Sequence, residues 1–153
     1  MVEDKMSNIK WFAVHLQQAM DECGMRCLSH KLGRQPYDIR RIMRSERVAL
    51  RTVDKIAPKL GMTVAEMFIQ PGVETDWYRE ARIEYFPQNF TEAMAASGYN
   101  TQALANSVGK TKSCVREWMD GKGYPLLIRL QNIADTLDME VADLFLPPEG
   151  DEE

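Results

Sequence analysis

The chain has 153 residues, of which 44% are hydrophobic, and its formal net charge is −4. No apolar run approaches the roughly 18 residues that a membrane-spanning helix needs, so we expect no membrane span. The length fits one large domain or two small ones, and the negative total charge argues at first against a nucleic-acid partner.

The first half of the chain predicts a series of short helices, because its apolar residues recur at three- and four-residue spacing. Ser7 is expected to cap the first helix with its hydroxyl group. Pro36 marks the first turn of another helix, where its missing N–H is not needed. Gln70-Pro71-Gly72 ends this unit. The predicted helices cover residues 7–22, 25–32, 36–44, 50–60 and 64–68.

The segment that joins the two halves, Thr75–Phe86, is too apolar to be a slack tether. Trp77, Ala81 and Tyr85 fall at four-residue spacing, which predicts a connecting helix that docks on one or both halves. Packing of Trp77 and Tyr85 between the halves is the favoured interpretation, and an exposed partner site is the alternative.

The second half contains two short helices separated by a turn and followed by two more, within Thr101–Phe145. Gly109 is placed where a helix needs a left-handed residue to stop. Thr111 is expected to cap the next helix, whose inward residues are Val115 and Trp118. This order is typical of a DNA-reading helix-turn-helix in a small helical bundle.

The same pattern occurs twice in the chain, at an offset that rises from 74 to 76 to 77 residues. The repeat covers roughly residues 7–69 and 86–146, and it predicts two units of about sixty residues that pack on each other. Leu28–Gly33 aligns with Leu104–Gly109, Leu60–Phe68 aligns with Leu137–Phe145, and Phe12, Leu16, Met20 and Gly24 pair with Phe86, Phe90, Met94 and Gly98.

Several of these motifs together resemble the lambda-repressor-like (Cro-type, or XRE) DNA-binding family. They are Thr101-Gln102, Gly109, Val115 with Trp118, Gly121, and the closing Val141–Phe145. The first copy has Met25-Arg26 in place of the Ser/Thr-Gln start. The resemblance implies an all-α fold of two tandem helix-turn-helix bundles joined by a helical linker. The expected parts are residues 1–70, the linker 71–86, residues 87–148, and an acidic disordered tail at 149–153.

Charge is distributed unevenly, which weakens the objection from the negative total. From Arg26 to Lys59 there are ten Lys or Arg and three Asp or Glu, a net charge of +7, so the rest of the chain carries −11. Residues Thr101–Gln131 carry a net +3, from five basic and two acidic residues. Such segregation is typical of a surface that binds nucleic acid.

The family pattern implies that the second motif helix of each copy reads bases in the major groove of double-stranded DNA. The first copy is favoured as the stronger reader, because Glu117 and Asp120 lie near the equivalent face of the second. The candidate DNA-binding residues are Arg26, Arg34, Gln35, Tyr37, Arg40, Arg41, Arg44 and Arg47 in the first copy and Gln102, Lys110, Thr111, Lys112, Ser113 and Arg116 in the second.

The resemblance implies a sequence-specific transcriptional regulator, of the repressor type found in phages and mobile elements, that works as a homodimer in the cytoplasm of a bacterium or of a phage host. The alternative is a protein-interaction module on a helix-turn-helix scaffold. It would bind a polymerase, a nuclease or another regulator through the acidic second half and the Trp77–Tyr85 region.

No enzyme, cofactor or metal ion is expected. His15 and His30 lie in predicted helices without a matched nucleophile, and no glycine-rich phosphate loop is present. Cys23, Cys27 and Cys114 are too sparsely spaced for a zinc site, and free thiols are the simplest interpretation.

Overall fold

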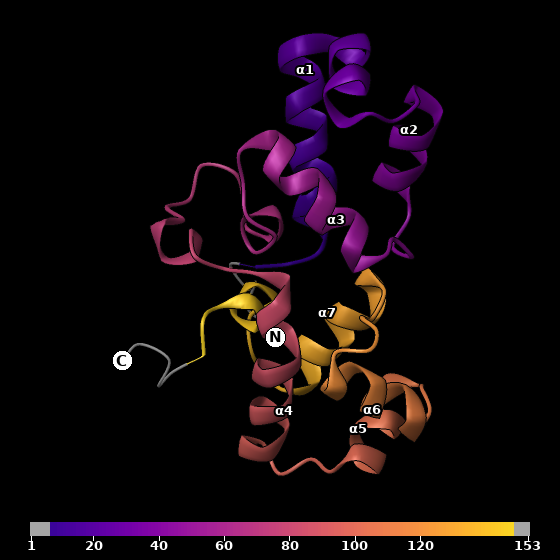
Figure 1. The fold of residues 1–153 in the computed structure, drawn as a ribbon, viewed down its shortest axis with the longest axis vertical. Coiled ribbons are helices and arrows are strands. Elements are labelled where there is room, and N and C mark those ends of the chain that lie inside the picture. The colour runs from indigo at the N-terminus through magenta and orange to yellow at the C-terminus, as the bar shows by residue number, and fades with distance from the viewer. Residues whose placement is uncertain (1–6, 149–153) are drawn as a thin grey trace, which may run out of the picture.

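A computed structural model describes residues 7–148 of the chain, and the predicted all-α class is confirmed for them. These residues form helices and two isolated β-bridges but no strand. The first half of the chain occupies the upper part of the view in Figure 1 and the second half the lower part. None of the helices within these residues is both long and apolar enough to cross a bilayer.

The first half begins with a helix that is broken once. α1 contains Gly24 at φ 84° and ψ 160°, which lies where the sequence predicts a boundary between two helices. The following helix starts with Pro36 in its first turn, also as predicted. The elements of this half are α1 (Lys10–Leu32), α2 (Pro36–Arg44), α3 (Leu50–Ile56), η1 (Ala57–Leu60) and η2 (Glu66–Phe68).

The second half repeats this order of elements. Thr111 Oγ1 accepts a hydrogen bond from the Cys114 N–H at 3.2 Å, so Thr111 is the cap that its position predicts. Gly109 and Gly121 end their helices in left-handed conformations. The elements are α4 (Phe86–Ala96), α5 (Thr101–Val108), α6 (Lys112–Asp120), α7 (Leu127–Thr136) and η5 (Val141–Phe145).

Left-handed backbone conformations occur at equivalent positions of the two halves. Gly24 pairs with Gly98 and Gly33 with Gly109, all four at positive φ. The position of Gly61 is taken in the second half by Asp138, whose φ of 56° is the only positive value at a non-glycine residue within residues 7–148. The backbone of the repeat is therefore retained even where the glycine is not.

Two equivalent core positions carry larger side chains in the second half than in the first. Leu16 and Ile42 of the first half are replaced in the second by Phe90 and Trp118, and all four side chains are buried. The rings of Phe90 and Trp118 meet edge to face, with centroids 6.1 Å apart. The second half therefore fills the space between its first helix and α6 with aromatic rings.

The two halves meet at residues that are equivalent in the repeat. Phe68 and Phe145 stack, with ring centroids 6.1 Å apart. Ala49 and Leu126 form an isolated antiparallel bridge. Each pair is separated by 77 positions, which is the repeat offset. Contacts between equivalent residues are what an approximate two-fold axis produces, so the halves are arranged like the subunits of a symmetric dimer.

The predicted helical linker is wrong. Residues 71–86 contain only two single 3-10 turns before α4, namely η3 (Asp76–Tyr78) and η4 (Ile83–Tyr85). Tyr78 and Ile83 are both buried, yet on one continuous helix they would point roughly 140° apart, so one face could not bury both. Trp77 is 77% exposed, so its predicted packing between the halves is also wrong.

Hydrogen bonds hold the linker against both halves. The Tyr78 hydroxyl donates to Asp143 Oδ1 at 2.7 Å, and the Thr63 hydroxyl donates to the Tyr78 carbonyl at 2.8 Å. Burial, together with the Asp143 carboxylate, raises the pKa of Tyr78, so its hydroxyl stays a donor at neutral pH. Arg79 Nη1 lies 2.8 Å from Oε1 of Glu66, whose side chain is almost fully buried.

Ser7 does not cap the first helix, because α1 begins only at Lys10 and the N-cap position is Ile9. Ser7 instead connects the start of the chain to the second half. Its N–H donates to Glu140 Oε1 at 2.6 Å, and its hydroxyl accepts from the Ala142 N–H at 2.9 Å. The Ile9 N–H donates to Gln131 Oε1 at 2.9 Å.

His15 holds the end of the first half in the way that Asn89 holds the end of the second. His15 Nε2 lies 2.6 Å from the Ile69 carbonyl oxygen, and Asn89 Nδ2 donates to the equivalent Leu146 carbonyl at 2.7 Å. Burial lowers the pKa of His15, and this effect outweighs its backbone hydrogen bonds and the nearby Glu66, which act in the opposite direction. The folded protein therefore favours the neutral imidazole.

We predict that the chain unfolds as one unit. Phe68→Ala removes a fully buried ring from the contact between the halves and is expected to lower the free energy of unfolding by about 3–5 kcal/mol. The transition in urea should remain single. Trp77→Ala, at an exposed site, is the control and should change stability by less than about 0.5 kcal/mol. A second transition with the wild-type midpoint would show that the halves unfold independently.

We also predict a pH dependence that belongs to His15. Above the unfolded pKa of about 6.5 its contribution to stability is complete, and it is lost as pH falls toward the lower folded pKa, with a slope of at most about 1.4 kcal/mol per pH unit. His15→Asn copies Asn89 and cannot titrate. Urea unfolding at pH 7.5 and 5.5 should therefore show a smaller loss in His15→Asn than in the wild type, and equal losses would disprove this role.

Candidate nucleic-acid interface

The outer face of α2 is cationic. Ile39 and Ile42 are buried and fix the orientation of the helix, and the opposite side is left to solvent. Tyr37 is 75% exposed at the start of this side, and three arginines follow it. The exposed residues Tyr37, Arg40, Arg41 and Arg44 are spaced by three, one and three positions, which places them on one face of the helix.

Two of the predicted DNA-binding arginines share one carboxylate. Arg34 Nη1 lies 2.6 Å from Asp38 Oδ2, and Arg41 Nη2 lies 2.5 Å from Asp38 Oδ1. These two guanidinium groups, with Arg34 contributing most, hold the pKa of Asp38 below its ordinary value. Asp38 therefore reduces the net charge at the start of α2 and also fixes the direction of both side chains.

A basic hollow of about 420 Å³ lies beside the N-terminus of α2. Its lining includes the cations Arg34, Lys55 and Lys59, the amide of Gln35, and the one carboxylate of Asp38, which is paired with Arg34. The unpaired N–H groups and the dipole of a helix N-terminus favour an anion at such a position. Lys55 comes from α3 and Lys59 from η1, the next two elements along the chain, so their place beside the start of α2 depends on how these helices pack.

The equivalent face of α6 is much less basic. Arg116 stands where Arg40 stands, but Glu117 replaces Arg41 and Asp120 replaces Arg44. All three residues of α6 are exposed. Its outer face therefore presents charges of both signs, which attract a phosphate backbone less than the three arginines of α2 do.

The predicted residues form two separate groups, one around α2 and one around α5 and α6. Both α2 and α6 lie on the right-hand side of the molecule in Figure 1, above and below the junction of α3 and α7. Arg34 is half-buried. Exposed to solvent are Arg26, Gln35, Tyr37, Arg40, Arg41, Arg44, Arg47, Gln102, Lys110, Thr111, Lys112, Ser113 and Arg116.

Several basic residues of the two basic stretches, Arg26–Lys59 and Thr101–Gln131, have structural contacts that their spacing does not predict. Lys59 Nζ donates to the Leu32 carbonyl at 3.1 Å, and Arg129 Nη1 donates to the Val108 carbonyl at 2.9 Å. Each of these contacts satisfies a carbonyl at the end of a helix. Arg51 lies over the ring of Tyr124, 4.9 Å from its centroid. The net charges of these two stretches therefore overstate the number of cations that are available to a ligand.

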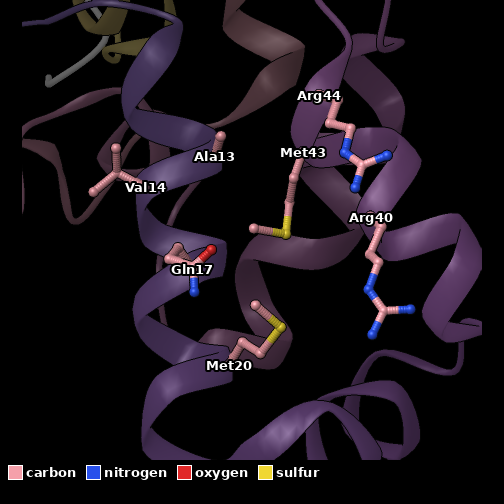
Figure 2. A pocket seen from close by; sticks show the side chains of 7 residues that line it. All are labelled: Ala13, Val14, Gln17, Met20, Arg40, Met43 and Arg44. Carbon is pink, nitrogen blue, oxygen red and sulfur yellow. The ribbon is translucent and has the colours of Figure 1, made fainter.

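A second hollow lies between α1 and α2 and was not predicted from the sequence. Figure 2 shows Met20 of α1 and Met43 of α2 projecting into it, with Arg40 and Arg44 along its edge. The four-residue spacing of Arg40 and Arg44 is visible in the sequence, but the gap between the two helices is not.

No group of three or more His, Cys, Asp or Glu residues within residues 7–148 is placed to hold a metal ion. Comparisons with known proteins give no match: no family model fits the chain, and neither a curated protein nor a solved structure is significantly similar to it. The geometry of the exposed helices is therefore the basis for assigning a function.

We predict that Arg34→Gln raises the pKa of Asp38 toward its ordinary value of 3.8 and that Arg41→Gln raises it by a smaller amount. The reason is that both guanidinium groups stabilise the carboxylate and Arg34 contributes more. A carbon-detected NMR titration of the Asp38 carboxyl group measures this shift directly. Arg40→Gln, which removes an arginine from the same helix, is the control and should leave the Asp38 titration unchanged.

Proposed function

We propose that the protein is a sequence-specific regulator of transcription, of repressor type, that reads the major groove of double-stranded DNA with α2 and α6. The single observation that carries this proposal is the exposed face of α2. A short helix held by Ile39 and Ile42 from below presents Arg40, Arg41 and Arg44 on its free side. The major groove of B-form DNA accommodates one such helix.

The chemistry of α2 suits both parts of DNA recognition. Arginine forms paired hydrogen bonds with the O6 and N7 atoms of guanine, and glutamine does so with adenine. Gln35 and Arg40 are therefore suited to contact bases. Arg26, Arg44 and Arg47 are suited to contact phosphates, and the hollow beside the helix N-terminus offers a further place for a phosphate group.

The arrangement of the halves supports a reading of two half-sites by one chain. The pairs Phe68–Phe145 and Ala49–Leu126 relate the halves by an approximate two-fold axis, and α2 and α6 lie on one side of the molecule. Two tandem helix-turn-helix units related in this way suit half-sites about one helical turn apart. The operator would then be an imperfect palindrome, because α2 and α6 present different residues. Association of two such chains, the predicted homodimer, would add further half-sites.

The charges favour unequal contributions of α2 and α6 to DNA binding. The pairs Arg41/Glu117 and Arg44/Asp120 put cations on α2 where α6 has carboxylates. A carboxylate accepts a hydrogen bond from cytosine but repels phosphate. We therefore infer that α2 supplies most of the affinity, and that α6 adds selectivity through Lys112, Ser113 and Arg116.

One observation favours the alternative of a protein-interaction module. Trp77 is 77% exposed and lies beside the exposed acidic residues Asp76 and Glu80. An exposed tryptophan at an acidic surface suits a basic protein partner. Salt separates the two functions, because a protein that neutralises several phosphates loses DNA affinity steeply as salt rises.

The test is a gel-shift titration on duplexes selected from a random pool, with two double variants compared. Arg40→Ala/Arg41→Ala is expected to weaken binding by roughly 10- to 100-fold, and Lys112→Ala/Arg116→Ala by less than about 10-fold. Each lost phosphate contact should also lower the salt slope by about one. Trp77→Ala is the control and should leave DNA affinity unchanged.

Equal losses in the two double variants would reject the unequal contributions of α2 and α6 to DNA binding. If the protein bound no duplex even at low salt, the proposed function would be wrong. Capture of a basic partner that Trp77→Ala abolishes would then favour the interaction module.

A further inference from the structure

The hollow between α1 and α2 has an apolar interior and a cationic edge. It is open to solvent on one side and has a volume of about 460 Å³, which falls in the range of roughly 300–1,000 Å³ typical of small-molecule sites. Ala13, Met20 and Met43 line its interior. Methionine side chains are flexible and polarizable, so they adapt to apolar ligands of different shapes.

The polar groups of this hollow all favour an anion. Arg40 and Arg44 line it from α2, and Gln17 adds an amide group from α1. Figure 2 shows the two guanidinium groups on the same side of the gap, with Gln17 facing them across it. No carboxylate of residues 7–148 forms an ion pair with Arg40 or Arg44. Their forked donors suit a carboxylate.

We propose that this hollow, the Met20–Met43 pocket, binds a small amphiphilic carboxylate, whose apolar chain lies against the methionines and whose carboxylate binds Arg40 and Arg44. The occupant is a small molecule because the volume matches one, and an anion because both charged residues of the lining are arginines. A bound carboxylate occupies two of the three arginines that α2 would present to DNA, so the ligand acts as an inducer.

The second half provides a comparison, because it keeps Met94, Met119 and Arg116 at the positions of Met20, Met43 and Arg40 but differs at the other positions of this site. Arg44 is replaced by Asp120, Gln17 by Thr91 and Ala13 by the larger Pro87. α4 and α6 also come close together there, since a Cβ atom on Gly121 would lie 3.4 Å from Pro87 Cγ. The proposed site therefore lies beside α2, and a variant of Arg116 serves as a matched control.

The inducer role depends on the proposed function, whereas binding to the pocket does not. Calorimetry on the full chain without DNA therefore tests the pocket alone, with decanoate below its micelle concentration as the probe. Decanoate should bind at a ratio of one per chain. Decanol and decyltrimethylammonium have the same chain without the negative charge and should bind at least about 10-fold more weakly.

Variants of the lining residues test whether decanoate binds in the Met20–Met43 pocket. Ala13→Phe fills the pocket and should abolish binding of decanoate. Met43→Gln keeps the volume of the side chain but makes it polar, and should weaken binding even if Ala13→Phe does not fold. Arg40→Gln/Arg44→Gln is expected to reduce affinity by roughly 10- to 100-fold. Arg116→Gln should bind decanoate as the wild type does.

The gel-shift experiment with added decanoate tests the inducer role. Decanoate should release the wild-type protein from its duplex, whereas DNA binding by Ala13→Phe should resist decanoate. Decanoate binding that is absent, or that is unchanged in both Met43→Gln and the arginine double variant, would overturn the pocket. Decanoate binding as described in a protein that binds no duplex would support the pocket and overturn the proposed function and the inducer role.

Discussion

The contact between equivalent residues of the two halves is the constraint on which the other surfaces depend. Phe68 stacks on Phe145, and Ala49 pairs with Leu126, so the halves meet across an approximate two-fold axis. The Leu127 N–H donates to the Val48 carbonyl at 3.0 Å close to this axis. Because the Ala49–Leu126 bridge lies between α2 and α3 in one half and between α6 and α7 in the other, it fixes the relative positions of α2 and α6. A shift at the junction would move both exposed helices with respect to each other.

The halves share left-handed backbone positions in equivalent places, while many of their equivalent side chains differ. The left-handed position of Gly61 is retained at Asp138, although a residue with a Cβ atom adopts this conformation at a cost of roughly 1 kcal/mol. The surfaces were not constrained in this way, so Arg44 could be exchanged for Asp120. This divergence explains how a chain with a net charge of −4 still presents a cationic helix.

Local signals in the sequence were sufficient to predict the helices of each half. Pro36, Thr111 and Gly109 determine where helices begin or end through bonds within a few residues, and the structure has each of them in that role. The outer face of α2 was predictable for the same reason, because the buried Ile39 and Ile42 leave only one side for the arginines.

The predictions of secondary structure that proved wrong concern segments whose conformation depends on contacts between residues distant in the sequence. Tyr78 is held by Asp143 and Thr63, and these bonds favour short turns over the predicted linker helix. The ion pairs of Asp38 lie within four positions of it and could have been predicted from spacing alone. The Met20–Met43 pocket could not have been predicted from spacing, because it depends on the separation of two helices and on the conformations of both methionine side chains.

The hydrogen bonds of Ser7 and Ile9 affect the order in which the parts of the protein acquire their native contacts during synthesis. Ser7 binds Glu140 and Ala142, and Ile9 binds Gln131, across separations of 133, 135 and 122 positions. A ribosome makes the first half before these partners exist, so the bonds of Ser7 and Ile9 form only after residues 131–142 have been synthesised. The start of the first helix is thus secured later than the rest of its own half is made. A product cut short by premature termination would carry α2 on a half whose first helix has an unanchored start.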